Sequence, residues 1–378
     1  MKIEWTLLTF TPLKLPNGIH QKFCDNVEQI ESAIRHGGFD YVIWRPDMKD
    51  SFIDLLVQLN QKCIAWVHNI PSPTTLRKLA NSEIVKSVIF VGHEALDLIR
   101  DHPVINKSNI IYNGFDSSPY LPLSQIKKDV NSVVYLGSLH PAKCFHLLAQ
   151  AWPQILKKNP NAKLTVIGSG ALYDRKSELG PFGLAEKSYE KLFSDPLLDK
   201  NGVIHSSVHF AGLLGHEKIP IMQKASVGVI NPHGKSEICP GSAIEFQACR
   251  TPVVAGARYG NLDTVKNKKT GFLVGSNKEL IAKILHLLDN PELVLSMGNS
   301  GTRFVEEKFS QEKTVNAWTK LFQDLTFDKS FKVQPMKSNW LYNFKFVFEI
   351  LRIIKFRFHL LKKLPSLYEI RERQKGNN

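Results

Sequence analysis

The sequence predicts an α/β protein in which two domains, each a doubly wound parallel sheet, face a central cleft and are followed by a basic tail. Apolar runs of strand length alternate with stretches of helical periodicity, which is the pattern of a parallel sheet covered by helices on both faces. Some of the apolar runs after residue 130 end on glycine, as Ser132–Gly137 does. With 378 residues, the chain is long enough for two such domains with full cores.

The composition is that of an ordinary globular protein. Hydrophobic residues make up 43% of the chain and charged residues 22%, so disorder is not expected. The 49 Lys and Arg residues against 35 Asp and Glu residues give a formal net charge of +14, which favours an anionic partner such as a nucleotide sugar, an anionic membrane surface or nucleic acid. The five cysteines are odd in number and form no C-x-x-C pair, which suits a reducing compartment and argues against a zinc site.

Targeting signals are not evident in the sequence. The N-terminal residues lack the charged start, apolar centre and small-residue cleavage site of a signal peptide. Apolar runs stay shorter than the roughly 18 residues that a membrane-spanning helix needs. We therefore expect a cytoplasmic protein that contacts the inner face of the cell membrane only peripherally.

Residues 1–125 are predicted to form the first domain. One helix is expected to turn Phe23, Val27, Ile30 and Ile34 to its inner face, because these residues recur at helical spacing. The other expected elements are strands at 3–10, 40–44, 63–68, 86–91 and 109–112 and helices at 51–60 and 93–100.

A histidine follows one of these strands. His68 closes the apolar run that starts at Cys63, just before the proline-rich turn Ile70–Pro73. Ligands of open parallel sheets bind beyond the carboxyl ends of the strands, which makes His68 a candidate site residue. The alternative is a hydrogen-bonded structural histidine.

Residues 126–131 are predicted to be a linker and residues 132–327 the second domain. Residues 171–205 are interpreted as an insertion with a short helix near 186–193. The other expected strands are at 132–137, 163–168, 208–212, 227–231 and 271–274. The other expected helices run from about 143 to 158 and over 216–225, 276–289, 291–307 and 311–325.

The segment between Glu237 and Arg250 contains the most candidate ligand-binding residues. Gly241 lets the backbone turn sharply and approach a ligand, Ser242 can cap the helix that starts there, and the free N–H groups of a helix start attract phosphate. Glu245 lies about one turn into that helix, and Glu237 lies on the loop before it. Both carboxylates can accept hydrogen bonds from the hydroxyls of a sugar. The alternative is that Glu237 is a solvated loop charge and Glu245 a carboxylate favoured by the helix dipole.

A second candidate phosphate site lies where Lys143 begins the helix after Gly137. There the lysine charge adds to the helix dipole, facing Gly241 and Ser242 across the strand ends. A solvated surface lysine is the alternative.

These motifs resemble a known family. Glu237 and Glu245 form an E-x7-E arrangement, and with Ala248, Thr251–Ala255, Gly260 and Thr270–Val274 they resemble the donor-site signature of retaining glycosyltransferases of family 4. The resemblance covers most of residues 132–325 and is weaker over the first 125 residues. It implies the GT-B fold, which has two Rossmann-like domains. The first domain is shorter in this chain than is usual for the fold.

The resemblance implies roles for individual residues. Glu237, His68 and Lys143 would be catalytic, with His68 near the reacting carbon of the donor sugar and Lys143 on the diphosphate. Gly241, Ser242 and Glu245 would bind the donor. Leu213 and Leu214 would hold the nucleobase through backbone groups. Ser138 stands where the family generally has an arginine, so one expected cation is absent from that position.

The implied activity is a metal-independent, retaining hexosyl transfer from a nucleotide-diphosphate sugar to a hydroxyl of a glycan or lipid-linked acceptor, in cell-envelope polysaccharide synthesis. No D-x-D metal motif lies near the proposed site, and no cofactor is expected. Two alternatives stay open: a GT-B nucleotide-sugar epimerase, and a catalytically inactive GT-B module that binds at the membrane.

The tail, residues 328–378, differs in kind from the two domains. From Phe331 onward it has eleven basic and three acidic residues, so +8 of the +14 net charge lies there, interleaved with aromatic side chains. This composition is typical of a helix at an anionic membrane surface, and we expect residues 340–375 to make that contact. The alternative is a terminal helix that packs back on the first domain. Nucleic-acid binding is not favoured, because the cations lie among large apolar residues rather than on a recognisable reading module.

Overall fold

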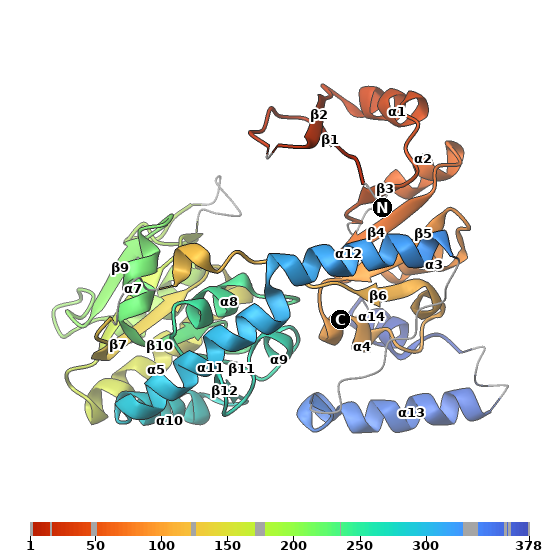
Figure 1. Cartoon of the computed structure of the whole chain (residues 1–378). Coiled ribbons are helices and arrows are strands. Elements are labelled where there is room, and N and C mark those ends of the chain that lie inside the picture. Colours follow the sequence, from red (N-terminus) through yellow and green to blue (C-terminus); the bar gives the residue numbers. More distant parts are fainter. Residues whose placement is uncertain are drawn as a thin grey trace.

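The computed structural model describes residues 3–15, 17–46, 51–121, 126–170, 178–234, 236–327, 339–358, 361 and 364–376. The chain forms two lobes, each built on a parallel sheet, and a helical tail that runs along one side of the molecule (Figure 1). The two-domain α/β fold predicted from the sequence is confirmed.

The C-terminal lobe contains a six-stranded parallel sheet. Its strands are β7 (Asp129–Leu136), β8 (Lys163–Ile167), β9 (Val208–Gly212), β10 (Ala225–Ile230), β11 (Val253–Gly256) and β12 (Gly271–Val274), in the spatial order β12-β11-β10-β7-β8-β9. Every residue of β10 is buried, as expected of a strand covered on both faces. β7 begins at Asp129, inside the stretch predicted as linker.

Helices cover both faces of this sheet. The short helix predicted in the insertion is present as α6, whereas α9 is a helix of four residues that the sequence did not predict. The helices are α5 (Phe145–Lys158), α6 (Lys187–Ser194), α7 (Lys218–Lys224), α8 (Gly241–Ala248), α9 (Asn261–Thr264), α10 (Asn277–Leu288), α11 (Pro291–Phe309) and α12 (Gln311–Thr326).

The N-terminal lobe is smaller. Its main sheet contains β3 (Val42–Trp44), β4 (Cys63–Val67), β5 (Val85–Phe90) and β6 (Ser108–Ile110), in that spatial order and all parallel. Its helices include α2 (Phe52–Gln58), α3 (Pro73–Asn81) and α4 (His93–Leu98).

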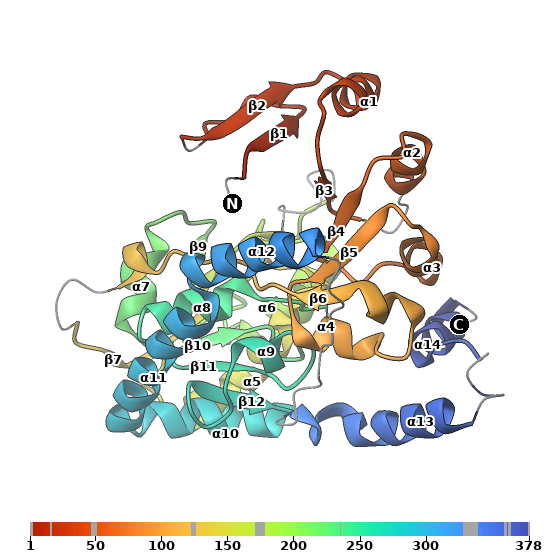
Figure 2. The ribbon, with the colours of Figure 1, turned by 45° about the vertical axis from the view of Figure 1, so that its right-hand side comes forward.

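The first two strands stand apart from that main sheet. β1 (Trp5–Thr9) pairs in parallel with β2 (Ile19–Phe23) in a sheet of their own, followed by α1 (Val27–His36) (Figure 2). Phe23, which we predicted on the inner face of a helix, therefore ends β2 and is 48% exposed. The helix starts later because Asn26 caps it, accepting the backbone N–H of Gln29 at 2.9 Å.

The last helix of the C-terminal lobe, α12, leaves that lobe and returns to the first lobe. α12 carries Trp318, Leu321 and Phe322 onto a face of the N-terminal sheet formed by Ile64 and Ile89. Two connections thus join the lobes: the segment after β6 and this returning helix (Figure 1).

A buried carboxylate joins the lobes between these connections. Oδ2 of Asp263, on α9, accepts the backbone N–H of Glu94 at the start of α4 (2.9 Å), and Oδ1 accepts the hydroxyl of Tyr112 (2.8 Å). Nζ of Lys308 lies 4.0 Å from Oδ1. Burial raises the pKa of the Asp263 carboxyl, which is 0% exposed.

The tail packs on the first lobe, so the alternative we gave for it is correct. It forms α13 (Lys345–Arg357) and α14 (Leu367–Gly376). The hydroxyl of Tyr368, on α14, donates to the carbonyl of Pro71, and Nε of Arg77 donates to Glu369 at 2.7 Å. Among the described residues, no helix combines the length and apolarity required to cross a bilayer.

The tail cations do not all face outward, as attraction to an anionic membrane would require. Nζ of Lys345 lies 2.5 Å from Glu94 and 3.0 Å from Asp97, and Nζ of Lys355 lies 3.0 Å from Asp101. The guanidinium of Arg352 donates to the backbone carbonyl of Asp97. We expected these three cations to attract an anionic membrane. That expectation is wrong, because carboxylates of α4 and of the residues after it neutralise them.

We expect Asp263→Ala to lower the free energy of unfolding by about 3 kcal/mol or more, because it removes one partner of a buried, hydrogen-bonded ion pair. Urea unfolding monitored by tryptophan fluorescence measures the change. The exposed Asp289→Ala serves as the matched control and should change stability by less than about 0.5 kcal/mol. Equal stability of the two variants would show that the Asp263 contacts contribute nothing net.

Candidate active site

The carboxyl ends of the central strands of the C-terminal lobe meet at one edge of its sheet. Gly137 follows β7, and Gly168 follows β8 with a φ of +148°. A Cβ at Gly168 would lie 1.9 Å from the carbonyl oxygen of Gly137, so this close approach of the two strand ends requires glycine. The two glycines that follow these strands therefore pack backbone against backbone.

The structure brings Lys143 and Glu237 together at this edge. Lys143 ends a short 3-10 helix, Pro141–Lys143, and its Nζ lies 2.8 Å from Oε1 of Glu237. The Glu237 side chain is only 8% exposed, so the alternative of a solvated loop charge is wrong. Asn231, at the end of β10, donates to the same oxygen at 2.9 Å.

Asn231 is a residue of the candidate site that sequence reasoning missed. Its side-chain amide also donates to the carbonyl of Ala142 at 3.1 Å, so it joins the Lys143 segment to the Glu237 loop. Its Oδ1 accepts the N–H of Gly234 at 2.9 Å, which fixes the turn leading to Glu237. The available signal was a polar amide directly at the carboxyl end of a strand, where ligands of parallel sheets bind.

The start of α8 is open, as a ligand-binding helix end should be. Gly241 is exposed, and a Cβ there would meet nothing within 4 Å. Its φ is not in the left-handed region, so the backbone conformation does not require glycine there, and open space distinguishes the position. Ser242 does not cap the helix: the N-cap is Pro240, without a side-chain hydrogen bond.

Glu245 has protein partners of its own. Its Oε1 accepts from Nζ of Lys218 at 2.7 Å and from the hydroxyl of Tyr120 at 3.0 Å. Burial and the adjacent Glu245 carboxylate raise the pKa of Tyr120, which keeps that hydroxyl a donor. Glu245 is therefore oriented by a cation and a phenol, and no hydrogen bond joins it to Glu237.

The Glu237 loop lies at the junction of the lobes. A Cβ on Gly92, which precedes α4, would lie 2.9 Å from the carbonyl oxygen of Ile238 and 2.8 Å from Oδ2 of Asp263. The Ile238 side chain packs against the core of the N-terminal lobe. The carboxylate beside it therefore belongs to an inter-lobe site.

His68 lies on the N-terminal lobe, at the carboxyl end of a strand as predicted. It follows β4 and lies edge-on to Trp66, with ring centroids 4.5 Å apart. Its Nε2 is buried without a hydrogen-bond partner, which does not fit the hydrogen-bonded structural histidine given as the alternative. Burial, followed by repulsion from Arg45, lowers the pKa of His68 to about 4, so the ring is neutral at physiological pH.

The remaining predicted residues lie on the C-terminal lobe. Ser138 is buried, and its hydroxyl oxygen has no hydrogen-bond partner. Leu213, just after β9, is 67% exposed, and Leu214 packs partly against the lobe core. Among the described residues no group of three or more His, Cys, Asp or Glu side chains is arranged to hold a metal ion.

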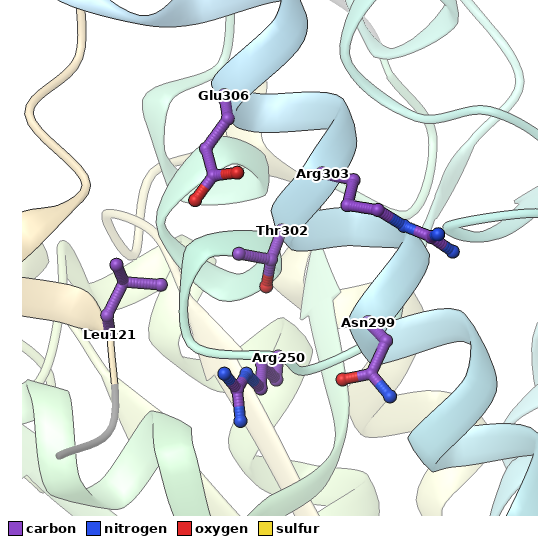
Figure 3. Close-up of a pocket in the computed structure, with 6 residues that line it drawn as sticks. All are labelled: Leu121, Arg250, Asn299, Thr302, Arg303 and Glu306. Atoms are coloured by element: carbon purple, nitrogen blue, oxygen red, sulfur yellow. The ribbon is translucent and has the colours of Figure 1, made fainter.

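A separate hollow lies at the opposite end of α8. It has a volume of about 470 Å³ and is lined by Leu121, Arg250, Asn299, Thr302, Arg303 and Glu306 (Figure 3). Arg250 and Arg303 point in different directions in this view, so their charges do not converge on one ligand. The hollow is not part of the site formed by Lys143 and Glu237.

We expect His68 to make folding sensitive to acid. The unfolded histidine binds a proton near pH 6.5 and the folded one only near pH 4, so the stability linked to neutral His68 is complete above 6.5 and is lost as the pH falls toward 4. His68→Gln should therefore lose less stability than the wild type between pH 7 and 4.5, measured by urea midpoints. The exposed His216→Gln is the control and should follow the wild type. An identical acid slope in both variants contradicts the assignment.

The chain is similar in sequence to known glycosyltransferases. Residues 122–304 match the family model "Glycosyl transferases group 1". The capsular polysaccharide biosynthesis glycosyltransferase CapM of Staphylococcus aureus is 31% identical over 62% of this chain and 58% of its own length. An uncharacterized glycosyltransferase of Haemophilus influenzae is 25% identical over 81% of this chain and 82% of its own.

Solved structures share the fold. HepE of Anabaena in complex with UDP superimposes with a TM-score of 0.62 at 18% identity, covering 80% of this chain and 82% of that one. A glycosyltransferase from Rickettsia africae gives a TM-score of 0.65 at 16% identity, with coverages of 82% and 85%. The chain spans little more than half the length of CapM. The fold is therefore GT-B, and residues 122–304 within it correspond to a glycosyl transferases group 1 domain.

Proposed function

We propose that the chain is a retaining glycosyltransferase of family 4 that moves a hexosyl group from a nucleotide-diphosphate sugar to a hydroxyl of a glycan or lipid-linked acceptor. The observation that carries this function is the pairing of Lys143 with Glu237 at 2.8 Å beside the open start of α8, at the lobe junction. A cation, a carboxylate and free helix-start amides are the groups that recognise a sugar joined to a diphosphate.

Each group has a separate part in the proposed reaction. Lys143 and the N–H groups at Gly241 and Ser242 stabilise the charge that develops on the departing diphosphate, so the chemistry we propose does not depend on a metal ion. Glu237, held by Asn231, accepts hydrogen bonds from sugar hydroxyls and fixes the donor. Neutral His68 approaches the same sugar from the other lobe and can accept or donate a hydrogen bond through Nε2.

The bond changes follow from retention of configuration. The bond from the anomeric carbon to the diphosphate oxygen breaks, and the acceptor oxygen bonds to that carbon on the same face. The acceptor proton passes to the departing phosphate oxygen, so the chain need not supply a separate base. Its contribution is positioning and preorganised charge.

Names of similar proteins suggest the setting. CapM is named for capsular polysaccharide biosynthesis, and another relative is a poly(ribitol-phosphate) alpha-N-acetylglucosaminyltransferase. We therefore propose a role in building a cell-envelope polymer at the cytoplasmic face of the membrane. Because HepE has been solved with UDP and with UDP-glucose, a UDP sugar is the first donor to test.

One observation favours a second candidate, an inactive GT-B binding module. The hydroxyl of Ser138 is buried without a partner where the resembling family generally has an arginine, and Glu245 is already paired with Lys218. Such a module would lack part of the charge needed for the departing diphosphate. An epimerase of the same fold is a further alternative, and product analysis with donor alone separates it from a transferase.

The proposed function predicts that the chain binds a nucleotide sugar. UDP, GDP, ADP, dTDP and CMP sugars are compared in a thermal-shift panel, and at least one should raise the unfolding temperature, because a ligand of the native state stabilises it by mass action. Failure of all five to stabilise the chain would favour a module that does not bind donors.

The proposed function also predicts that Lys143 and Glu237 contribute to turnover of that donor. Lys143→Ala and Glu237→Ala should each lower the rate of nucleoside diphosphate release at least tenfold, with unchanged circular dichroism, because each removes charge or a hydrogen bond from the transition state. The matched controls are Lys157→Ala and Glu292→Ala, which are exposed and distant in the fold. Near-normal turnover in either site variant would overturn this site.

A further inference from the structure

We propose that α13 is a membrane-inserting helix of inverted polarity, whose charged side is fixed to the protein and whose apolar side enters the hydrocarbon edge of a bilayer. This inference does not require the proposed catalytic activity. In this proposal the tail binds the membrane because apolar side chains are buried in it, and not because tail cations are attracted to anionic lipid.

The charged side of α13 forms one stripe. Lys345, Glu349, Arg352 and Lys355 recur at spacings of three and four residues, so they share a face of the helix. Arg352 and Lys355 are buried, and the side chains of Lys345 and Glu349 are 15% and 19% exposed.

Three carboxylates of the N-terminal lobe meet this stripe. Glu94 and Asp97, on α4, bind Lys345, and Asp101 binds Lys355 at 3.0 Å and lies 3.7 Å from Nε of Arg352. These carboxylates are themselves almost completely buried. The stripe is therefore saturated by the protein, and its cations are not free to attract a distant anion.

The opposite side of α13 is exposed and apolar. Arg357, at the C-terminal end, is the one charged residue of α13 that is exposed. The exposed apolar residues of α13 and its two flanking positions are Phe344, Phe346, Val347, Phe348, Ile350, Leu351, Ile353, Ile354, Phe356 and Phe358, each between 38% and 71% exposed.

The width of this apolar surface favours a bilayer over a second copy of the chain as the partner that covers it. At 3.6 residues per turn, the exposed residues from Ile353 round to Leu351 cover an arc of about 160°, which contains none of the four residues of the charged stripe. A helix that packs on a protein core uses an apolar stripe of about 100° or somewhat more. A second copy of the chain would leave part of the arc in water, whereas fluid hydrocarbon can surround all of it.

The position and length of α13 fit the same occupant. In both views the helix lies along the lower margin of the molecule, with no other element beyond it (Figures 1 and 2). Its 13 residues are fewer than the about 20 that span a bilayer, so it would lie in the interface plane. Arg357 lies at the end of the helix, where a cation can reach the headgroups.

Sedimentation of the full chain with phosphatidylcholine vesicles tests the proposal. The wild type should bind vesicles without anionic lipid, and raising the salt from 0.1 to 0.5 M should change the partition less than threefold, because burial of apolar surface is not screened. The double variant Ile350→Glu, Ile353→Glu should bind at least tenfold more weakly. The matched control is Leu295→Glu, Val315→Glu, which changes two residues of similar exposure on α11 and α12 and should bind like the wild type.

Three outcomes would overturn the proposal. The first is binding that requires phosphatidylglycerol and disappears at 0.5 M salt. The second is a chain that, with an unchanged melting temperature, does not bind vesicles of either composition. The third is a lipid-free dimer, seen by analytical ultracentrifugation, that the Ile350→Glu, Ile353→Glu variant dissociates, since the apolar face would then belong to a second copy of the chain.

Discussion

The buried carboxylate of Asp263 is the constraint on which the arrangement of the two lobes depends. It belongs to the C-terminal lobe but accepts a backbone N–H from α4 and a hydroxyl from Tyr112, so both of these donors reach it from the N-terminal side of the junction. The Glu237 loop lies against the same junction, because a Cβ at Gly92 would lie 2.9 Å from the carbonyl oxygen of Ile238. The orientation of the candidate catalytic carboxylate therefore follows from how the lobes are joined.

Much of the fold could be predicted from local pattern, because apolar runs and glycine ends are properties of neighbouring residues. β2 could not: the sequence of Ile19–Phe23 alternates weakly, and its pairing with β1 is set by tertiary contact. The family motif singled out Lys143 and Glu237 but not their contact with each other. It did not indicate the partners of Glu245 either, since Lys218 and Tyr120 lie 27 and 125 positions away. The tail misled us for the same reason, because the carboxylates that neutralise it lie about 250 positions earlier.

The tail also connects to the junction. Glu94 contributes its backbone N–H to Asp263 and its side chain to Lys345 and Asn339. The tail reaches the other lobe as well, where the side-chain amide of Asn267 donates to the hydroxyl of Tyr342 and Arg371 donates to Tyr259. Burial, opposed by Lys345, raises the pKa of Glu94 to about 7. The segment that we propose for membrane contact is thus two contacts, both through Glu94, away from Asp263 at the lobe junction.

The central claim is that Lys143, Glu237 and the open start of α8 together hold a nucleotide sugar between the lobes. A crystal structure of the chain with a bound nucleoside diphosphate tests it most directly. The account predicts phosphate oxygens within about 3.2 Å of Nζ of Lys143 and of the backbone N–H groups of Gly241 and Ser242. A nucleotide bound elsewhere, for example in the hollow beside Arg250, with the edge around Lys143 empty, would contradict it.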